Sequence, residues 1–329
     1  MTKYTLAGIG NAVVDVISHA DDSFLDLMGI EKGIMQLIER DRGEVLYGAM
    51  TDRLQTPGGA VANTIAGVGA LGLPTAFIGR VHDDTLGRFY AKSMQDSGTD
   101  FVNAPVSGGD LPTSRSMIFV SPDGERSMNT YLGISTDLGP DDVPDAVASN
   151  SEIMFLEGYL FDKDQGKEAF RQASRLTRAG GGKAGIAISD PFCVNRHRAD
   201  FLDMIQNELD YVIGNEHEIL SLFETDDLEA AMAKTAGMID LMVCTRSGDG
   251  VTIMGGSERH DIPVETITPV DATGAGDQFA AGFLYGLATG RDLGTCGRMG
   301  NLCAAEVISH VGPRPQADMK QRFAAAGLE

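Results

Sequence analysis

The feature that most constrains the fold of this 329-residue chain is the alternation of short, apolar, β-rich runs with helix-like patterns. From about residue 150 onward this alternation predicts a largely parallel sheet with helices on both faces, hence an α/β fold. The candidate strands are Leu6–Ile9, Val13–Ile17, Thr75–Val81, Arg115–Val120, Ile153–Glu157, Ala184–Ser189, Tyr211–Gly214, Leu241–Thr245 and Val251–Met254. The candidate helices are Ala60–Leu71, Lys167–Arg178, Leu228–Met238 and Gln278–Leu287.

Two stretches of the N-terminal half, residues 11–50 and 104–133, break this alternation. They contain short strand candidates and turn signals but few long helical patterns. We predict that both stretches form a small β subdomain attached to one α/β domain that spans residues 1–329.

A large excess of acidic residues limits the partners of the chain. It contains 47 Asp and Glu against 26 Lys and Arg, a formal charge of −21. Such a surface repels nucleic acid, and it requires any phosphate site to be a local exception built from backbone N–H groups and a few cations. No apolar run reaches membrane-spanning length, and the N-terminus shows no secretory signal pattern. We therefore expect a cytoplasmic protein that binds neither nucleic acid nor membranes.

The patterns of cysteine, histidine and glycine argue against disulfide bonds, metal sites and a Walker-type phosphate loop. Cys193, Cys244, Cys296 and Cys303 have no CxxC spacing and are predicted to be reduced core thiols. The six histidines show no metal-binding pairing. The run GGGK at residues 180–183 lacks the remainder of a Walker motif, so it is interpreted as a helix end before a strand.

The strongest chemical signal is the string VDATGAGD at residues 270–277, which runs into a helical apolar pattern. Gly274 and Gly276 flank Ala275, so backbone N–H groups can converge at the positive end of the helix without obstruction by Cβ atoms. Such a nest suits a phosphoryl group in transit, and Asp277 can accept a proton from an attacking hydroxyl. A bare GxGD could equally be a tight turn followed by a first-turn helix acid.

The longer string DATGAGDQFAAGFL resembles the C-terminal signature of the PfkB, or ribokinase-like, family of carbohydrate and nucleoside kinases. The resemblance extends over essentially the whole chain and implies that the small β subdomain is a lid over the substrate. It also implies that Asp277 is the catalytic base and that the N–H groups of Ala275, Gly276 and Asp277 form an anion hole. Asp271 and Thr273 match positions that, in some members, help to bind a monovalent cation such as K⁺ through nearby carbonyls; whether this chain does so stays open.

Two N-terminal motifs carry polar residues suited to a sugar. In GNAVVD at residues 10–15, Asn11 and Asp15 could take several ribose hydroxyls, or they could be a turn Asn and an exposed strand Asp. In PGGAVAN at residues 57–63, Gly58 and Gly59 allow close backbone approach and Asn63 could bond a sugar hydroxyl; the alternative is a simple turn before a helix. The second motif resembles the family's other signature.

Further details resemble adenosine kinases more than plain sugar kinases. Asn11 and Val13 match positions that meet the purine, and Asp15 matches one that meets the ribose hydroxyls. Arg126, in PDGERS at residues 122–127, matches a phosphate-facing arginine, although a solvated turn arginine is the plainer interpretation. Tyr159 or Phe161 could supply an aromatic wall for adenine, and both could equally be core residues.

A further pair of motifs resembles the nucleotide end of the family's site. Asn215 and Glu218, in GNEHE at residues 214–218, would act through water on Mg²⁺ and the ATP phosphates, unless they only begin a helix.

The turn TRSGDG resembles the family's nucleotide-binding turn. Thr245, Gly248 and Gly250 lie in it, and Thr245 and Gly248 would approach the ATP. Asn301 matches a position that lines the ATP adenine.

These features together predict a kinase that uses ATP and Mg²⁺ to phosphorylate the 5′-hydroxyl of adenosine, giving AMP and ADP in purine salvage. One alternative is a kinase for ribose, fructose or 2-keto-3-deoxygluconate, and a second is a nucleoside-binding regulator without catalysis. The expected partners are ATP and a small-molecule substrate, and the chain could be a monomer or a homodimer.

Overall fold

A nine-stranded sheet forms the centre of the protein, which a computed structural model describes over residues 3–265 and 267–328. The strand order is β14-β13-β12-β11-β10-β9-β1-β5-β6. All neighbouring pairs from β12 to β6 in this order are parallel, whereas β13 and the edge strand β14 are antiparallel. The strands are β1 (Tyr4–Ile9), β5 (Thr75–Ile78), β6 (Thr99–Phe101), β9 (Ser151–Glu157), β10 (Lys183–Ala187), β11 (Tyr211–Asn215), β12 (Leu241–Thr245), β13 (Val251–Gly255) and β14 (Glu258–Ile262). The predicted α/β fold with a largely parallel sheet is confirmed.

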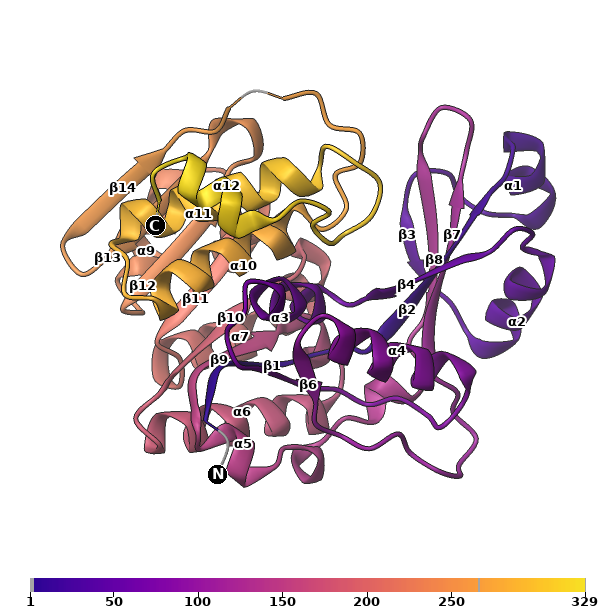
Figure 1. The fold of residues 1–329 in the computed structure, drawn as a ribbon, viewed down its shortest axis with the longest axis horizontal. Coiled ribbons are helices and arrows are strands. Elements are labelled where there is room, and N and C mark those ends of the chain that lie inside the picture. The colour runs from indigo at the N-terminus through magenta and orange to yellow at the C-terminus, as the bar shows by residue number, and fades with distance from the viewer. Residues whose placement is uncertain (1–2, 266, 329) are drawn as a thin grey trace.

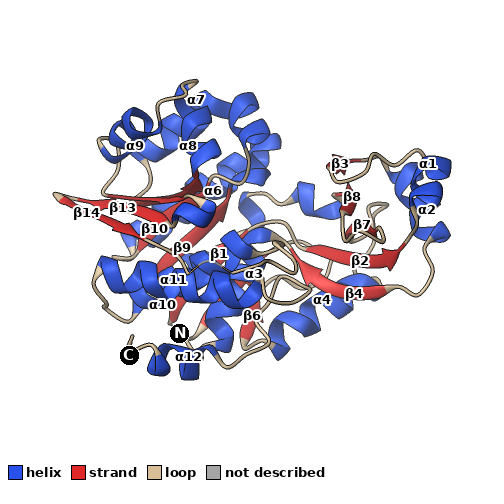
Figure 2. Ribbon diagram, turned by 90° about the horizontal axis from the view of Figure 1, so that it is seen from above, coloured by secondary structure: helices blue, strands red, loops and turns tan. Residues whose placement is uncertain are grey.

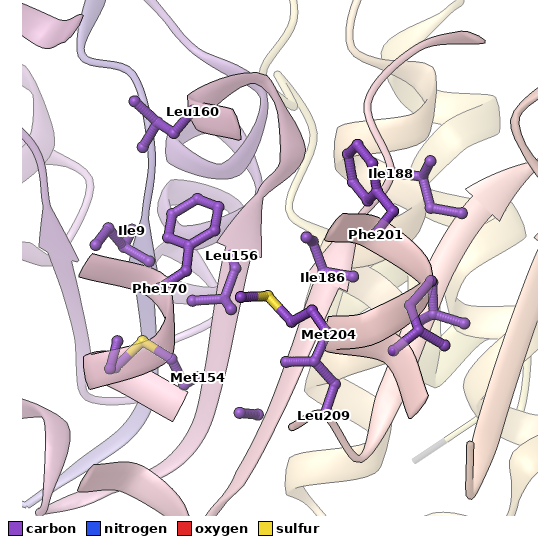
Figure 3. Close-up of a cluster of buried hydrophobic side chains, with 14 of the residues drawn as sticks. Ile9, Met154, Leu156, Leu160, Phe170, Ile186, Ile188, Phe201, Met204 and Leu209 are labelled. Atoms are coloured by element: carbon purple, nitrogen blue, oxygen red, sulfur yellow. The ribbon is translucent and has the colours of Figure 1, made fainter. Parts of the chain in front are cut away.

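Helices cover both faces of this sheet (Figure 2). One layer contains α5 (Asp145–Ala148), α6 (Asp164–Ala179), α7 (Pro191–Asn207), α8 (Glu216–Phe223) and α9 (Leu228–Ala236). The other contains α3 (Ala60–Ala70), α4 (Thr85–Asp96), α10 (Ala275–Ala288), α11 (Leu293–Val307) and α12 (Met319–Ala325). Side chains alternate along a strand, so in β1 Leu6 packs with the α3 and α10 layer while Ala7 and Ile9 pack with the α6 layer. Figure 3 shows the hydrophobic cluster between the sheet and the α6 layer, in which Ile9, Phe170 and Phe201 are buried.

A five-stranded sheet in the order β3-β8-β7-β2-β4 forms a separate arm beside the main body (Figure 1). The arm comprises β2 (Val13–His19), α1 (Asp22–Met28), β3 (Met35–Leu37), α2 (Arg40–Ala49), β4 (Leu54–Gly58), β7 (Ser114–Val120) and β8 (Arg126–Tyr131). Helices α1 and α2 cover one face of the sheet, and Phe24 of α1 packs on Phe119 of β7 with ring centroids 5.4 Å apart. We call this arm the lid sheet.

The lid sheet is wider than the two predicted stretches. Its edge strand β4 lies beyond residue 50, in a segment that sequence reasoning interpreted as a turn before a helix. Pro57 pairs with Val14 there, and an edge strand tolerates a proline because one side of it has no partner strand. The N-terminal segment Gly10–Ala12 joins β1 of the main sheet directly to β2 of the lid sheet, so the two sheets meet at Asn11.

All four cysteines are free and buried, as predicted. In the described part of the chain, no helix is both long and apolar enough to cross a membrane.

Candidate active site

Most of the predicted site residues gather where the parallel strands end, between the main body and the lid sheet. The carboxyl ends of parallel strands meet at one edge of a sheet, which is where open α/β sheets bind ligands. Two hollows lie at this edge, and Ala60 and Asp277 line both of them. A cleft of about 450 Å³ faces the lid sheet, and a narrower groove of about 120 Å³ leads from Asp277 toward Glu218.

The glycine-rich turn before α10 is where we predicted an anion hole from the N–H groups of Ala275, Gly276 and Asp277. Gly274 has φ +81, and a Cβ atom there would lie 2.7 Å from the Cα of Pro313, so only glycine fits. The N–H groups of Gly276 and Asp277 have no hydrogen-bond partner among the described residues. The N–H of Ala275 donates to the carbonyl of Ala272 at 3.2 Å, so its part in an anion hole stays a prediction. Two N–H groups at a helix start are therefore available to an anion.

Asp277 lies in the first turn of α10 and lines both hollows. Its Oδ2 accepts a hydrogen bond from Nδ2 of Asn63 at 3.0 Å. Burial raises the pKa of Asp277 to about 7; the Asn63 hydrogen bond opposes the rise, and the charges of Glu157 and Asp15 add to it. A carboxyl with a pKa near neutrality is suited to accept a proton from an alcohol.

Asn63 is itself held by a residue that sequence reasoning missed. Arg314, in the segment between α11 and α12, donates from Nε to Oδ1 of Asn63 at 3.2 Å. Both polar atoms of the Asn63 side chain are thus engaged, one with Arg314 and one with Asp277. The string GPRP at residues 312–315 is the only local sign of this arginine, and no spacing rule singles it out.

Asp15 of β2 is the acidic residue of the lid sheet that faces the cleft. Burial raises its pKa to about 7, whereas Arg126 and Arg314 lower it. The carboxylate packs on Gly58, where a Cβ would lie 2.6 Å from Oδ2, and Gly59 at φ +99 leaves room for the Asn11 carbonyl. The glycines predicted to allow close approach do so, but what approaches is the chain's own Asp15 and Asn11.

Asn11 lines the cleft but has few free hydrogen-bonding groups. Glu157 at the end of β9 accepts from both the backbone N and Nδ2 of Asn11, at 3.1 and 2.9 Å. Oδ1 of Asn11 accepts from the Ser135 hydroxyl at 2.8 Å. Glu157 also accepts from the N–H of Val61 at 3.0 Å, at the start of α3. This buried network ties β9 to two of the connections between main body and lid sheet, and sequence reasoning did not find it.

The lid side of the cleft mixes apolar and polar side chains, and the main body contributes aromatic and charged ones. Besides Asn11, Asp15, Asn63 and Asp277, the lining includes Val13, Met35, Leu37, Ser116, Met128, Thr130, Leu132, Tyr159, Asp162, Asp190, Phe192 and Arg196. Tyr159 lines the cleft. Phe161 is instead buried and stacks on Phe201 with ring centroids 4.2 Å apart, so it is a core residue. Phe192, which is 76% exposed at the start of α7, is a second aromatic that sequence reasoning missed.

The lid sheet touches the glycine-rich turn through Arg126, the first residue of β8. Nη2 of Arg126 lies 2.6 Å from Oδ2 of Asp271, and Nη1 donates to the hydroxyl of Thr273 at 3.2 Å. Although burial acts against it, N–H donation from Gly312 and Thr273 and the charge of Arg126 together lower the pKa of Asp271. Each carboxylate oxygen of Asp271 thus has a partner within the chain, and a K⁺ site on carbonyls near Asp271 and Thr273 stays a prediction.

The groove beside Asp277 contains the two residues predicted to act on a magnesium ion. Asn215 caps α8 and forms reciprocal hydrogen bonds with Glu218, including Nδ2 to Oε1 at 2.7 Å. Burial raises the pKa of Glu218 to about 7, with Asp190 adding to the rise and the Asn215 N–H opposing it. Thr245 lines the same groove. A carboxylate and an amide beside a helix start could hold a hydrated divalent cation and phosphate oxygens.

Three further residues predicted to bind nucleotide lie outside these two hollows. Gly248 has open space around it, whereas a Cβ at Gly250 would lie 2.0 Å from the Ile262 carbonyl, so the latter glycine is required by the approach of β14. Asn301 of α11 donates to the carbonyl of Pro263 at 3.2 Å. Their role in nucleotide binding stays a prediction. In the described residues, no group of three or more His, Cys, Asp or Glu could hold a metal ion.

Comparison with known proteins agrees with the phosphoryl-transfer site that this geometry describes. A family model described as "pfkB family carbohydrate kinase" matches residues 27–319. A fructokinase from Klebsiella pneumoniae is 30% identical over 241 residues, which cover 71% of this chain and 78% of the fructokinase.

Solved structures are more similar still. A probable sugar kinase from Rhizobium etli has a TM-score of 0.92 and 42% identity, with all of both chains covered. An adenosine kinase from Sinorhizobium meliloti has a TM-score of 0.91 and 43% identity, covering 99% of this chain and all of the other.

Proposed function

Because the chain belongs to the pfkB family of carbohydrate kinases, and so is a phosphotransferase that acts on an alcohol group, we propose that it phosphorylates the 5′-hydroxyl of adenosine. ATP is the proposed donor, with Mg²⁺, and the products are AMP and ADP. Membership in a kinase family argues against the third possibility, a nucleoside-binding regulator without catalysis.

The observation that carries the choice of adenosine is the mixed lining of the cleft. It combines the polar residues Asp15, Asn63 and Asp277 with apolar lid residues such as Val13 and Leu37 and with the aromatic residues Tyr159 and Phe192. A nucleoside needs this combination, because its ribose offers hydroxyls and its base offers flat apolar faces. The 43% identity to the S. meliloti adenosine kinase supports the same acceptor.

The residues of the groove fit a magnesium-bound triphosphate. The free N–H groups of Gly276 and Asp277 point to an anion site, and a Cβ at Gly276 would meet open space where an anion can lie. Glu218 and Asn215 would hold the hydrated Mg²⁺, whose chemistry is to neutralise charge on the phosphate oxygens.

In the proposed reaction the chain positions groups and accepts one proton. Asp15 orients the ribose so that its 5′-oxygen lies beside Asp277, which takes the hydroxyl proton at the carboxylate that Asn63 holds in place. The N–H groups of Gly276 and Asp277, with Arg126 of the lid sheet, stabilise the negative charge of the transferring group. Closure of the lid sheet excludes water from the cleft.

A sugar kinase is the second candidate, and the 30% identity to a fructokinase favours it. A sugar acid such as 2-keto-3-deoxygluconate would require a free cation for its carboxylate. Arg196, a guanidinium of the cleft wall, is held by both oxygens of Asp162, at 3.0 and 2.9 Å. That pairing leaves it poorly placed for an acidic sugar and favours a neutral acceptor.

The test is ADP release with adenosine, inosine, ribose, fructose and 2-keto-3-deoxygluconate as acceptors, in wild type and in a Leu37→Ser, Met128→Ser variant. We expect adenosine to have the highest kcat/KM, and the variant to raise KM for adenosine about tenfold or more because apolar contacts are lost. Leu27→Ser is the control, because Leu27 is 82% exposed on α1 and lies outside the cleft. Higher kcat/KM for a free sugar, unaffected by the double variant, would contradict the proposal.

A further inference from the structure

Arg314 is a cation placed behind the reacting end of the cleft with no acidic partner in direct contact. Its guanidinium donates to Oδ1 of Asn63 at 3.2 Å and to the sulfur of Met94 at 3.4 Å. Among the described residues it forms no ion pair with a carboxylate. It is not among the residues that line the cleft, so it is not positioned to contact an acceptor.

The segment that carries Arg314 is rigidly held. The carbonyl of Pro313 accepts from Nε2 of Gln278 at 3.0 Å, which ties the segment to α10 one residue after Asp277. Buried Glu306 of α11 accepts from the N–H groups of Gln316 and Ala317, at 3.1 and 2.8 Å. Prolines at 313 and 315 restrict the backbone on both sides of the arginine. These contacts come from two helices and fix the guanidinium with little freedom to leave.

A partly buried guanidinium without a carboxylate in contact is unfavourable for folding, because its lost hydration is not repaid by an ion pair. The groups whose charges act on Arg314 are Tyr90 on α4, Asp15 on the lid sheet and Asp277 on α10. Two acids, Glu157 from β9 and Asp15 from β2, face Asp277, and each disfavours its ionised form. Arg314 is the cation that offsets them at this carboxyl.

We propose that Arg314 is the positioning residue of the proton acceptor. Through Nε it fixes the Asn63 amide with its N–H toward Asp277, and through its charge it favours the carboxylate form of Asp277 that accepts a proton. The inference rests on the proposed function only in taking Asp277 as the base. It assigns a role to a residue that no motif in the sequence indicated.

The experiment compares Arg314→Met, Arg314→Lys and a control, Arg88→Met, with wild type. Methionine keeps the apolar stem without the charge, and lysine keeps the charge without the fork geometry. Arg88 is an exposed arginine on α4 that pairs with Asp83 at 2.7 Å, away from the cleft. The first readout is the titration of the Asp277 carboxyl by ¹³C NMR in selectively labelled protein without ligands, assigned by comparison with Asp277→Asn.

We expect the Asp277 pKa to rise by about one unit or more in Arg314→Met, to stay near the wild-type value in Arg314→Lys, and to be unchanged in Arg88→Met. Site-resolved NMR separates Asp277 from Asp15, which lies in the field of the same arginine. An Asp277 pKa that is the same in Arg314→Met and wild type would overturn the inference.

The second readout is the pH profile of kcat/KM for adenosine. We expect its acidic limb to move upward with the NMR titration in Arg314→Met, so that activity falls about tenfold or more at low pH and approaches wild type at high pH. An equal loss at every pH would indicate a structural role and overturn the inference. Absence of wild-type turnover with adenosine would instead refute the proposed function, while the NMR titration, which needs no substrate, still decides the role of Arg314.

Discussion

Replacing Asp277 by Asn is expected to stabilise the protein at alkaline pH while removing its activity. Burial raises the pKa of Asp277 from 3.8 to about 7, so the folded state holds the proton more tightly than the unfolded state does. The contribution of Asp277 to the free energy of unfolding is therefore fully present below the pKa of the unfolded state, and it is lost as the pH rises through the pKa of the folded state. Asn carries no charge and avoids that loss, and its side-chain oxygen can still accept from Asn63.

The size of the effect follows from the shift. Each pKa unit corresponds to about 1.36 kcal/mol, so a shift of about three units bounds the effect near 4 kcal/mol. Asp277 faces cleft water, which screens its charge. We therefore expect Asp277→Asn to exceed wild type by about 1–2 kcal/mol in the free energy of unfolding at pH 8.5. At pH 5, where the folded carboxyl is protonated, the advantage of Asn should be smaller by about 1 kcal/mol.

Urea denaturation of ligand-free wild type and Asp277→Asn at pH 5 and pH 8.5 measures this difference. The comparison between the two proteins cancels the other carboxyls, which titrate in both. Asp226→Asn is the control, because Asp226 is exposed and does not line the cleft. If Asp277→Asn is no more stable than wild type at pH 8.5, burial does not destabilise the ionised carboxylate, and the predicted rise of its pKa is wrong.

Three further predictions concern the groove and the lid sheet. Glu218→Gln should raise the Mg²⁺ concentration for half-maximal turnover about tenfold or more without lowering Tm; an unchanged Mg²⁺ requirement would refute the metal role. Gly276→Ala should fold normally but lose turnover, because the added Cβ would occupy the open space where the anion would lie. Gly274→Ala should also lose about 1–3 kcal/mol of stability in denaturant, because Gly274 has φ +81 and the added Cβ would lie 2.7 Å from the Cα of Pro313. Arg126→Met should lower kcat about 100-fold and make the ligand-free lid sheet easier to cleave by protease; equal cleavage would show that its contact with the glycine-rich turn does not hold the lid.

The main sheet could be predicted because each of its inner strands is a short apolar run bounded by turn residues. Elements without that pattern were missed. Strand β14 (Glu258–Ile262) is largely polar because it is an edge strand, and β3 has only three residues, Met35–Leu37. Strand β4 was hidden by Pro57, which is tolerated at a sheet edge. Local patterns thus identify elements that are buried on both faces more readily than elements at an edge.

The candidate site was predictable where its chemistry lies in one string, and not where it depends on distant contacts. Asp277 and its glycines stand together in the sequence, so their shape and charge could be inferred. Arg314 meets Asn63 across 251 residues, and its meaning appears only when both side chains are placed. The same holds for Glu157, whose partner Asn11 lies 146 residues away, and for the choice between Tyr159 and Phe161, which only burial decides.

The central claim, phosphoryl transfer to the 5′-hydroxyl of adenosine with Asp277 as the base, is tested most directly by chromatographic measurement of AMP. The assay uses purified protein, adenosine and Mg-ATP, with 5′-deoxyadenosine as an acceptor that lacks the reacting hydroxyl. We predict that wild type forms AMP in step with ADP, and that Asp277→Asn binds adenosine with similar affinity but forms AMP at least about 1,000-fold more slowly. AMP formation by Asp277→Asn at a rate near that of wild type, or ADP release by wild type that is independent of the 5′-hydroxyl, would contradict the account.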